Sequence, residues 1–104
     1  MNDAFKALAN PVRRHIVERL AEGPATVGEA TGGLGVSKPA ITKHLKVLEE
    51  SGVVSRVIDG RVHRLALEPA PLAEVGDWLD QQRARWERLF DVVEDYLEER
   101  GEIT

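Results

Sequence analysis

One stretch of the sequence, residues 36–48, combines side chains that can bond to phosphates and nucleobases at regular spacing. Ile41, Leu45 and Leu48 would share one face of a helix. The side chains that would face the other way are Lys38, Pro39, Thr42, Lys43 and Lys46. Lysines neutralise phosphates and a threonine hydroxyl can bond to a base edge, so the pattern predicts a DNA-binding helix capped by Ser37. The alternative is an ordinary solvated helix face.

A second group of basic residues lies on a predicted hairpin. The segments 53–58 and 61–67 are rich in β-branched and aliphatic residues, and Asp59-Gly60 between them predicts a type I′ turn with positive φ at both residues. Arg61 would then lie at the tip and could reach an adjacent minor groove. The hairpin also carries Arg56, His63 and Arg64. The alternative role for these charges is protection of an edge strand from aggregation.

The net charge of −4 and pI of about 5.4 do not exclude a nucleic-acid partner, because the charge is unevenly distributed. Residues 1–73 hold ten Lys/Arg against eight Asp/Glu, whereas residues 74–104 hold four against ten. Within 36–64 the basic residues outnumber the acidic ones by six to three, with His44 and His63 in addition. Phosphate contacts depend on the local field, so a basic surface is predicted between Lys38 and Arg64.

Three helices are predicted before the 37–51 helix. The first covers Asp3–Ala9, and Asn10-Pro11 starts the second as a cap and first-turn proline; Gly23-Pro24 ends it. Thr26 and Glu29 have the spacing of a capping box, which predicts a short third helix before the glycines at 32, 33 and 35. Gly52 is expected to end the 37–51 helix in a left-handed conformation.

A long C-terminal helix is predicted from Leu72 to about Arg100, after a stiff connector at 68–71 that contains two prolines. Its apolar residues recur at spacings of three and four: Leu72, Val75, Leu79, Trp86, Leu89, Phe90, Val93, Tyr96 and Leu97. A core of about 70 residues cannot cover so much apolar surface, which predicts self-association through this helix. The alternative is packing of the helix against its own domain.

These elements predict one domain over residues 1–104, mainly α with a small β-hairpin, in the order α-α-α-α-β-β-α. A three-helix unit followed by a two-stranded wing is a winged helix-turn-helix, which presents one helix to the major groove. The sequence has no signal-peptide pattern and no apolar run near 18 residues, so a cytoplasmic protein without membrane association is predicted.

Four motifs allow a comparison with known families: LANPVRRHI at 8–16, VSKPAITKHLKVL at 36–48, SGVV at 51–54 and Gly60-Arg61. Together they make the stretch from Phe5 to Leu67 resemble the ArsR/SmtB family of dimeric winged-helix repressors. The tail, with Trp78-Leu79, Arg85-Trp86 and YLEE at 96–99, resembles the branch of the family that lacks inducer-metal sites.

The resemblance implies a homodimeric, sequence-specific repressor that binds an inverted-repeat operator through the 37–51 helix. It implies a dimer formed by the first helix and by the last, at 71–100. The expected DNA contacts are Ser37, Lys38, Pro39, Thr42, Lys43, His44, Lys46, Arg61, His63 and Arg64. The expected dimer contacts are Phe5, Leu8, Leu79, Trp86, Phe90, Val93, Tyr96 and Leu97.

Metal sensing and catalysis are not predicted. The chain has no cysteine, the last helix has no histidine, and His15, His44 and His63 lie on three different elements, with His15 expected to be partly buried. No metal or other cofactor and no nucleophile–base pair is predicted, so the protein is not expected to be an enzyme; any small-molecule effector is unknown. A second class of function is a protein-interaction module whose acidic last helix binds a basic partner.

Overall fold

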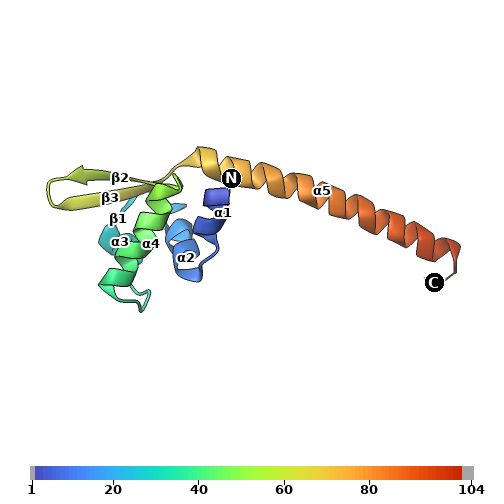
Figure 1. Ribbon diagram of the computed structural model, residues 1–104, viewed down its shortest axis with the longest axis horizontal. Helices are drawn as coiled ribbons and strands as arrows, with labels where there is room; N and C mark the ends of the chain where they lie inside the picture. The colour runs from blue at the N-terminus through green and yellow to red at the C-terminus, as the bar shows by residue number, and fades with distance from the viewer. Residues whose placement is uncertain (1, 102–104) are drawn as a thin grey trace.

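The computed structural model describes residues 2–101 as a body of short helices and strands with one long helix projecting from it (Figure 1). The elements are α1 (Asn2–Leu8), α2 (Pro11–Leu20), β1 (Ala25–Thr26), α3 (Val27–Thr31), α4 (Lys38–Glu50), β2 (Val54–Asp59), β3 (Val62–Leu67) and α5 (Pro69–Glu99). The long helix gives the chain extents of 69 × 28 × 22 Å. The fold is a winged helix-turn-helix, as predicted.

Side chains before α2, α3 and α4 satisfy the free backbone N–H groups that begin each helix. Asn10 Oδ1 accepts from the N–H groups of Val12 and Arg13, and Ser37 Oγ accepts from that of Ala40. The capping box is complete: Thr26 Oγ1 accepts from Glu29 N–H and the Glu29 carboxylate accepts from Thr26 N–H, both at 3.2 Å. The predicted starts of these helices are thus confirmed.

The sheet has three strands, because a two-residue strand joins the predicted hairpin. The order is β1-β3-β2 and both pairings are antiparallel, with Ala25 opposite Leu65 and Thr26 opposite Arg64. The strand β1 was not predicted, and it adds one element between α2 and α3 to the predicted order. Two residues carry too little pattern to predict a strand, and β1 forms only because β3 offers it a free edge.

The hairpin turn differs from the predicted type I′ turn. Asp59 belongs to β2 and pairs with Val62, so the two central residues of the turn are Gly60 and Arg61. Gly60 has a φ of 62°, whereas no non-glycine residue in the described chain has a positive φ. Positive φ at the first central residue alone is the type II′ pattern, which also matches the twist of paired strands.

The core lies where α1–α4 meet the sheet. Its members with the largest fully buried side chains come from α2, α4, the segment after α4, and β3: Ile16, Leu48, Val53 and Leu65. Gly52 ends α4 with a φ of 78°, as predicted, and lets the chain turn directly into β2.

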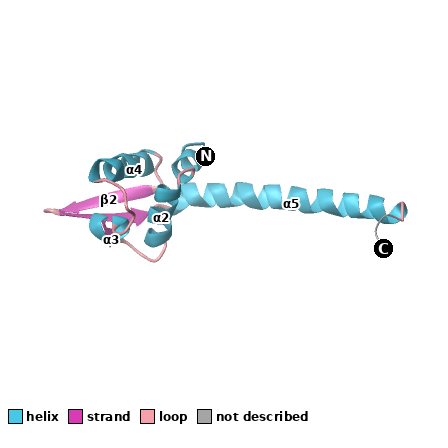
Figure 2. Cartoon of the chain, turned by 90° about the horizontal axis from the view of Figure 1, so that it is seen from below, coloured by secondary structure: helices cyan, strands magenta, loops and turns pink. Residues whose placement is uncertain are grey.

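The helix α5 begins at Pro69, so the predicted connector at 68–71 is wrong in part. Prolines are tolerated in a first helical turn because their missing N–H groups would have no partner there. Among the described residues of α5, only Val75 is buried. We call residues 2–78 the head and residues 79–99 the α5 extension, which projects away from the other elements in both views (Figures 1 and 2).

Candidate nucleic-acid interface

The two faces of α4 differ in the way its sequence predicts. Leu45 and Leu48 are buried and half-buried Ile41 packs against the core. The exposed side chains of α4 and its cap are Ser37, Lys38, Pro39, Thr42, Lys43 and Lys46. Burial of the apolar face fixes the rotation of α4 and therefore holds the lysine face toward solvent.

The polar groups on this face differ in the contacts they make within the chain. Thr42 Oγ1 donates to the Lys38 carbonyl at 3.1 Å, and Lys46 Nζ lies 3.8 Å from a Glu50 carboxylate oxygen. No carboxylate among residues 2–101 lies within ion-pair distance of Lys38 or Lys43. Lys38 and Lys43 are therefore the cations of this face with the least competition from the protein's own carboxylates.

His44 lies on the edge of the lysine face and is half-buried. Its Nδ1 accepts from Arg13 Nη1 at 3.2 Å, while Arg13 Nε and Nη2 donate to the carbonyls of Ala7 and Lys6. Arg13 thus joins the last turn of α1 to α4 and orients the His44 ring. Arg13 could not be given this role from the sequence, since helical periodicity shows only that it lies off the apolar face of α2.

The wing, the hairpin formed by residues 54–67, carries the remaining predicted DNA contacts. Arg61 is exposed in the turn and Arg64 is exposed on β3, whereas His63 is half-buried. The Nδ1 of His63 accepts from Arg56 Nη1 at 2.9 Å. Arg61 at the tip and Arg64 on β3 thus present exposed cationic groups, whereas the His63 ring is hydrogen-bonded within the wing.

The capping box of α3 also changes the pKa of its own glutamate, Glu29. Hydrogen bonds from the side chain and then the backbone of Thr26, together with the positive charges of Arg19 and Arg64, lower the pKa of Glu29 below its ordinary value of 4.5. Arg19 Nη2 lies 3.9 Å from a Glu29 carboxylate oxygen. The carboxylate of Glu29 therefore stays ionised to a lower pH than an ordinary glutamate, and it lies at the start of α3, where the helix dipole favours a negative charge.

The side chains predicted at a dimer interface are mostly exposed in the single chain. On the α5 extension, Leu79, Trp86, Phe90, Val93 and Tyr96 are exposed and Leu97 is half-buried. On α1, Phe5 and Leu8 are half-buried, and the Phe5 ring lies edge-on to Trp78 with centroids 5.3 Å apart. The stripe does not pack against its own head beyond Trp78, so the alternative of intramolecular packing fails for the α5 extension.

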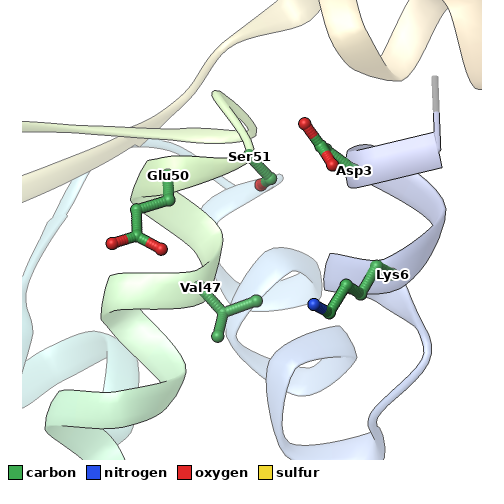
Figure 3. Close-up of a pocket in the computed structure, with 5 residues that line it drawn as sticks. All are labelled: Asp3, Lys6, Val47, Glu50 and Ser51. Carbon is green, nitrogen blue, oxygen red and sulfur yellow. The ribbon is translucent and has the colours of Figure 1, made fainter.

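An open hollow of about 210 Å³ lies between α1 and the end of α4 (Figure 3). It is lined by Asp3, Lys6, Val47, Glu50 and Ser51. Ligand pockets usually enclose about 300–1,000 Å³ and are mainly apolar. The hollow is smaller and is lined mostly by polar and charged groups, so we assign it no ligand.

The histidines do not gather with carboxylates. Within residues 2–101, no three His, Asp or Glu side chains form a group suited to a metal ion. His15 is exposed, which corrects the expectation of partial burial. A helix can expose a histidine wherever its own apolar stripe already fills the core, as Ile16 and Leu20 do here. No described helix is long and apolar enough to span a membrane.

A helix with a buried apolar face, an exposed lysine face and an adjacent basic wing defines a DNA-binding winged helix-turn-helix protein. Residues 8–57 match the model of a helix-turn-helix domain family. The chain is 39% identical over 101 residues to the HTH-type transcriptional regulator Rv2034 of Mycobacterium tuberculosis, covering 97% of this chain and 92% of the relative.

Two further similarities agree with this class. The transcriptional repressor SdpR of Bacillus subtilis is 33% identical over 79 residues, which cover 76% of this chain and 88% of SdpR. The chain also resembles the crystal structure of an ArsR family transcriptional regulator, RHA00566, with a TM-score of 0.75. The two sequences are 41% identical, and the match covers 83% of this chain and 94% of that chain. The chain belongs to the ArsR/SmtB family of winged-helix transcriptional regulators.

Proposed function

We propose that this protein is a cytoplasmic homodimeric repressor that binds an inverted-repeat operator. In this proposal α4 enters the major groove, and Arg61 at the tip of the wing reaches the adjacent minor groove. The relatives support the role as a repressor, since SdpR is a transcriptional repressor. The proposal includes no catalytic step and no metal or other cofactor.

One observation carries the DNA contact: the exposed face of α4 bears Lys38, Thr42 and Lys43 while Leu45 and Leu48 anchor the opposite face in the core. Pro39 and Ser37 lie at the N-terminus of the same helix, where the dipole favours a phosphate. We assign Lys38 and Lys43 to phosphate or guanine contacts and Thr42 to a base edge. Lys46, Arg61 and Arg64 complete the basic surface, and His44 and His63 support it from their half-buried positions.

The homodimer is supported by the exposed apolar stripe of the α5 extension. Trp86, Leu89 and Phe90 are each more than half exposed in the single chain, an unusual amount of contiguous apolar surface for a soluble protein. A second copy offers the same stripe, and a two-fold interface requires a surface that complements itself. The two α4 helices would then meet half-sites about one helical turn apart.

The proposal is tested by binding to duplexes that contain the DNA upstream of the protein's own gene. Wild type should prefer this DNA over a random duplex at moderate salt, and its affinity should fall steeply as salt rises. Lys43→Ala should weaken operator binding by about 1–3 kcal/mol, roughly 5- to 150-fold, without changing the fold. Arg88→Ala is the matched control, because it removes a positive charge from the exposed far side of the α5 extension.

The outcomes separate the parts of the proposal. If wild type shows no preference for its own upstream DNA over random duplex, operator binding there is wrong, and a protein partner for the acidic α5 becomes the better hypothesis. If Lys43→Ala and Arg88→Ala bind equally well, α4 is not the reading helix. Sedimentation of wild type at micromolar concentration tests the homodimer, and a monomer there would contradict it.

A further inference from the structure

Three side chains connect the end of α4 to both strands of the wing. Arg56 on β2 donates to both carboxylate oxygens of Glu49 on α4, from Nε at 2.7 Å and from Nη2 at 3.0 Å. Its remaining nitrogen, Nη1, donates to Nδ1 of His63 on β3 at 2.9 Å. The side chains of Arg56 and Glu49 are only 25% and 30% exposed. All three guanidinium nitrogens are therefore used inside the protein.

The strand register explains why this network lies where it does. Val54, Arg56 and Ile58 alternate onto one face of β2, opposite Leu67, Leu65 and His63 respectively. Val54 and Leu65 on that face are buried in the core. Two residues further along, at Ile58, the face is exposed. The network thus occupies the boundary at which the wing leaves the core and loses apolar support.

We propose that Glu49, Arg56 and His63 fix the angle between α4 and the wing, and that Arg56 is a positioning residue for DNA binding. The inference rests on the proposed DNA-binding function and names how two separate contact surfaces are held in register. A bidentate arginine–carboxylate pair has a defined geometry and is stronger than a single-point ion pair. Holding the wing in its binding orientation reduces the entropy lost when Arg61 and Lys43 engage DNA together.

For Glu49, charge alone predicts the opposite effect on DNA binding. Glu49 puts a negative charge in the last turn of α4, the helix proposed to bind DNA, so simple electrostatics predicts that neutralising it strengthens DNA binding. If Glu49 instead positions the wing, neutralisation weakens binding to the operator. Arg56 and Arg61 should also differ in role. Arg61 neutralises a phosphate, whereas Arg56 supports DNA binding only by holding the wing in position.

The experiment measures operator and random-duplex affinities over a range of salt for Glu49→Gln and Arg56→Met. Both variants should lose about three- to tenfold in operator affinity, and Glu49→Gln should bind random duplex at least as well as wild type. The dependence of log K on log salt should keep its slope in Arg56→Met, whereas Arg61→Ala should flatten it by about one. Glu50→Gln is the matched control, because within residues 2–101 the Glu50 carboxylate is ion-paired with exposed Lys46 alone, and loss of its charge should not weaken operator binding.

A second measurement reports the wing angle directly. The chain has no cysteine, so spin labels can be attached through Glu18→Cys on α2 and Asp59→Cys on the wing. The distance distribution between them should broaden in Glu49→Gln, which keeps the size of the side chain and should keep the fold.

Several outcomes would overturn the inference: operator binding by Glu49→Gln as tight as that of wild type, a flattened salt slope in Arg56→Met, or an unchanged distance distribution. If wild type itself fails to select the operator, the proposed function fails rather than the positioning role alone, so the two failures are distinguishable.

Discussion

The head and the α5 extension use the same apolar residue types in opposite ways. In the head, Ile16, Leu48 and Leu65 are completely buried by side chains from other elements. In the α5 extension, Leu89 and Phe90 are 57% and 63% exposed, although they lie on a periodic stripe of the same kind. The apolar side chains of the head are therefore covered by the same chain, whereas those of the α5 extension are left exposed.

This difference shows what each region depends on. Most helical stability in proteins comes from packing an apolar face, and isolated helices are marginal in water. The α5 extension has hydrogen bonds and surface pairs such as Arg83 with Asp80, but exposed pairs of this kind contribute little. Its stability should depend on protein concentration if a second copy covers the stripe, whereas that of the head should depend on its own core.

The largest expected effect comes from truncating one leucine in each region. Leu48→Ala should lower the free energy of unfolding by about 2–5 kcal/mol, because it removes buried methyl groups and leaves a cavity. Leu89→Ala is the matched substitution in the α5 extension and should leave unfolding of the head unchanged at concentrations where the protein is monomeric. Urea titrations followed by tryptophan fluorescence and circular dichroism measure both free energies of unfolding. An equal loss of stability in the two variants would contradict the distinction between the head and the α5 extension.

A charge on the stripe should separate association from folding. Phe90→Glu should raise the dimer dissociation constant by about tenfold or more, since a carboxylate would have to be buried without a partner. Operator binding should weaken in parallel, while the core of the head stays folded. Sedimentation velocity and the binding assay provide the two measurements.

The matched control is Arg88→Glu, which adds a glutamate two residues earlier in the chain and on the opposite side of the helix. It should leave both association and operator binding nearly unchanged. Loss of association in both variants to the same degree would mean that net charge, not the stripe, governs dimerisation.

Local signals in the sequence were sufficient for most of the head. The caps at Asn10, Thr26 and Ser37 and the buried face of α4 depend on residues within one or two turns, and spacing alone predicts them. The type of the hairpin turn was harder to predict, because it depends on whether Asp59 pairs with β3 or belongs to the loop. The strand β1 depends on a pairing with residues about forty positions away, which no local pattern reveals.

For the candidate site, the sequence predicts which residues can bind DNA but not which of them already form hydrogen bonds or ion pairs within the chain. Arg56 and Arg61 have the same chemistry and lie on the same hairpin, yet Arg56 is bonded to Glu49 and Arg61 is exposed. Likewise, the contact of Arg13 with His44 joins side chains that are 31 positions apart. Such contacts arise when elements pack together, so the structure is needed to distinguish a positioning residue from a contact.

The smallest expected effect lies within the head, at the start of α3. Thr26→Ala should lower the free energy of unfolding by about 1 kcal/mol at neutral pH, because Thr26 caps the helix and bonds to Glu29. Thr31→Ala, which removes a hydroxyl from the other end of the same helix, should cost less.

The Glu29 carboxylate makes a second, pH-dependent contribution to the same cap. Because folding lowers the pKa of Glu29, its ionised form stabilises the head above the ordinary value of 4.5, and this stabilisation is lost as the pH falls through the lowered folded-state pKa. Glu29→Gln should therefore be less stable than wild type at neutral pH and approach it in acid. Urea titrations at several pH values measure the difference, and a gap that stays constant or widens in acid would show that the Glu29 carboxylate does not stabilise the head through this pKa shift.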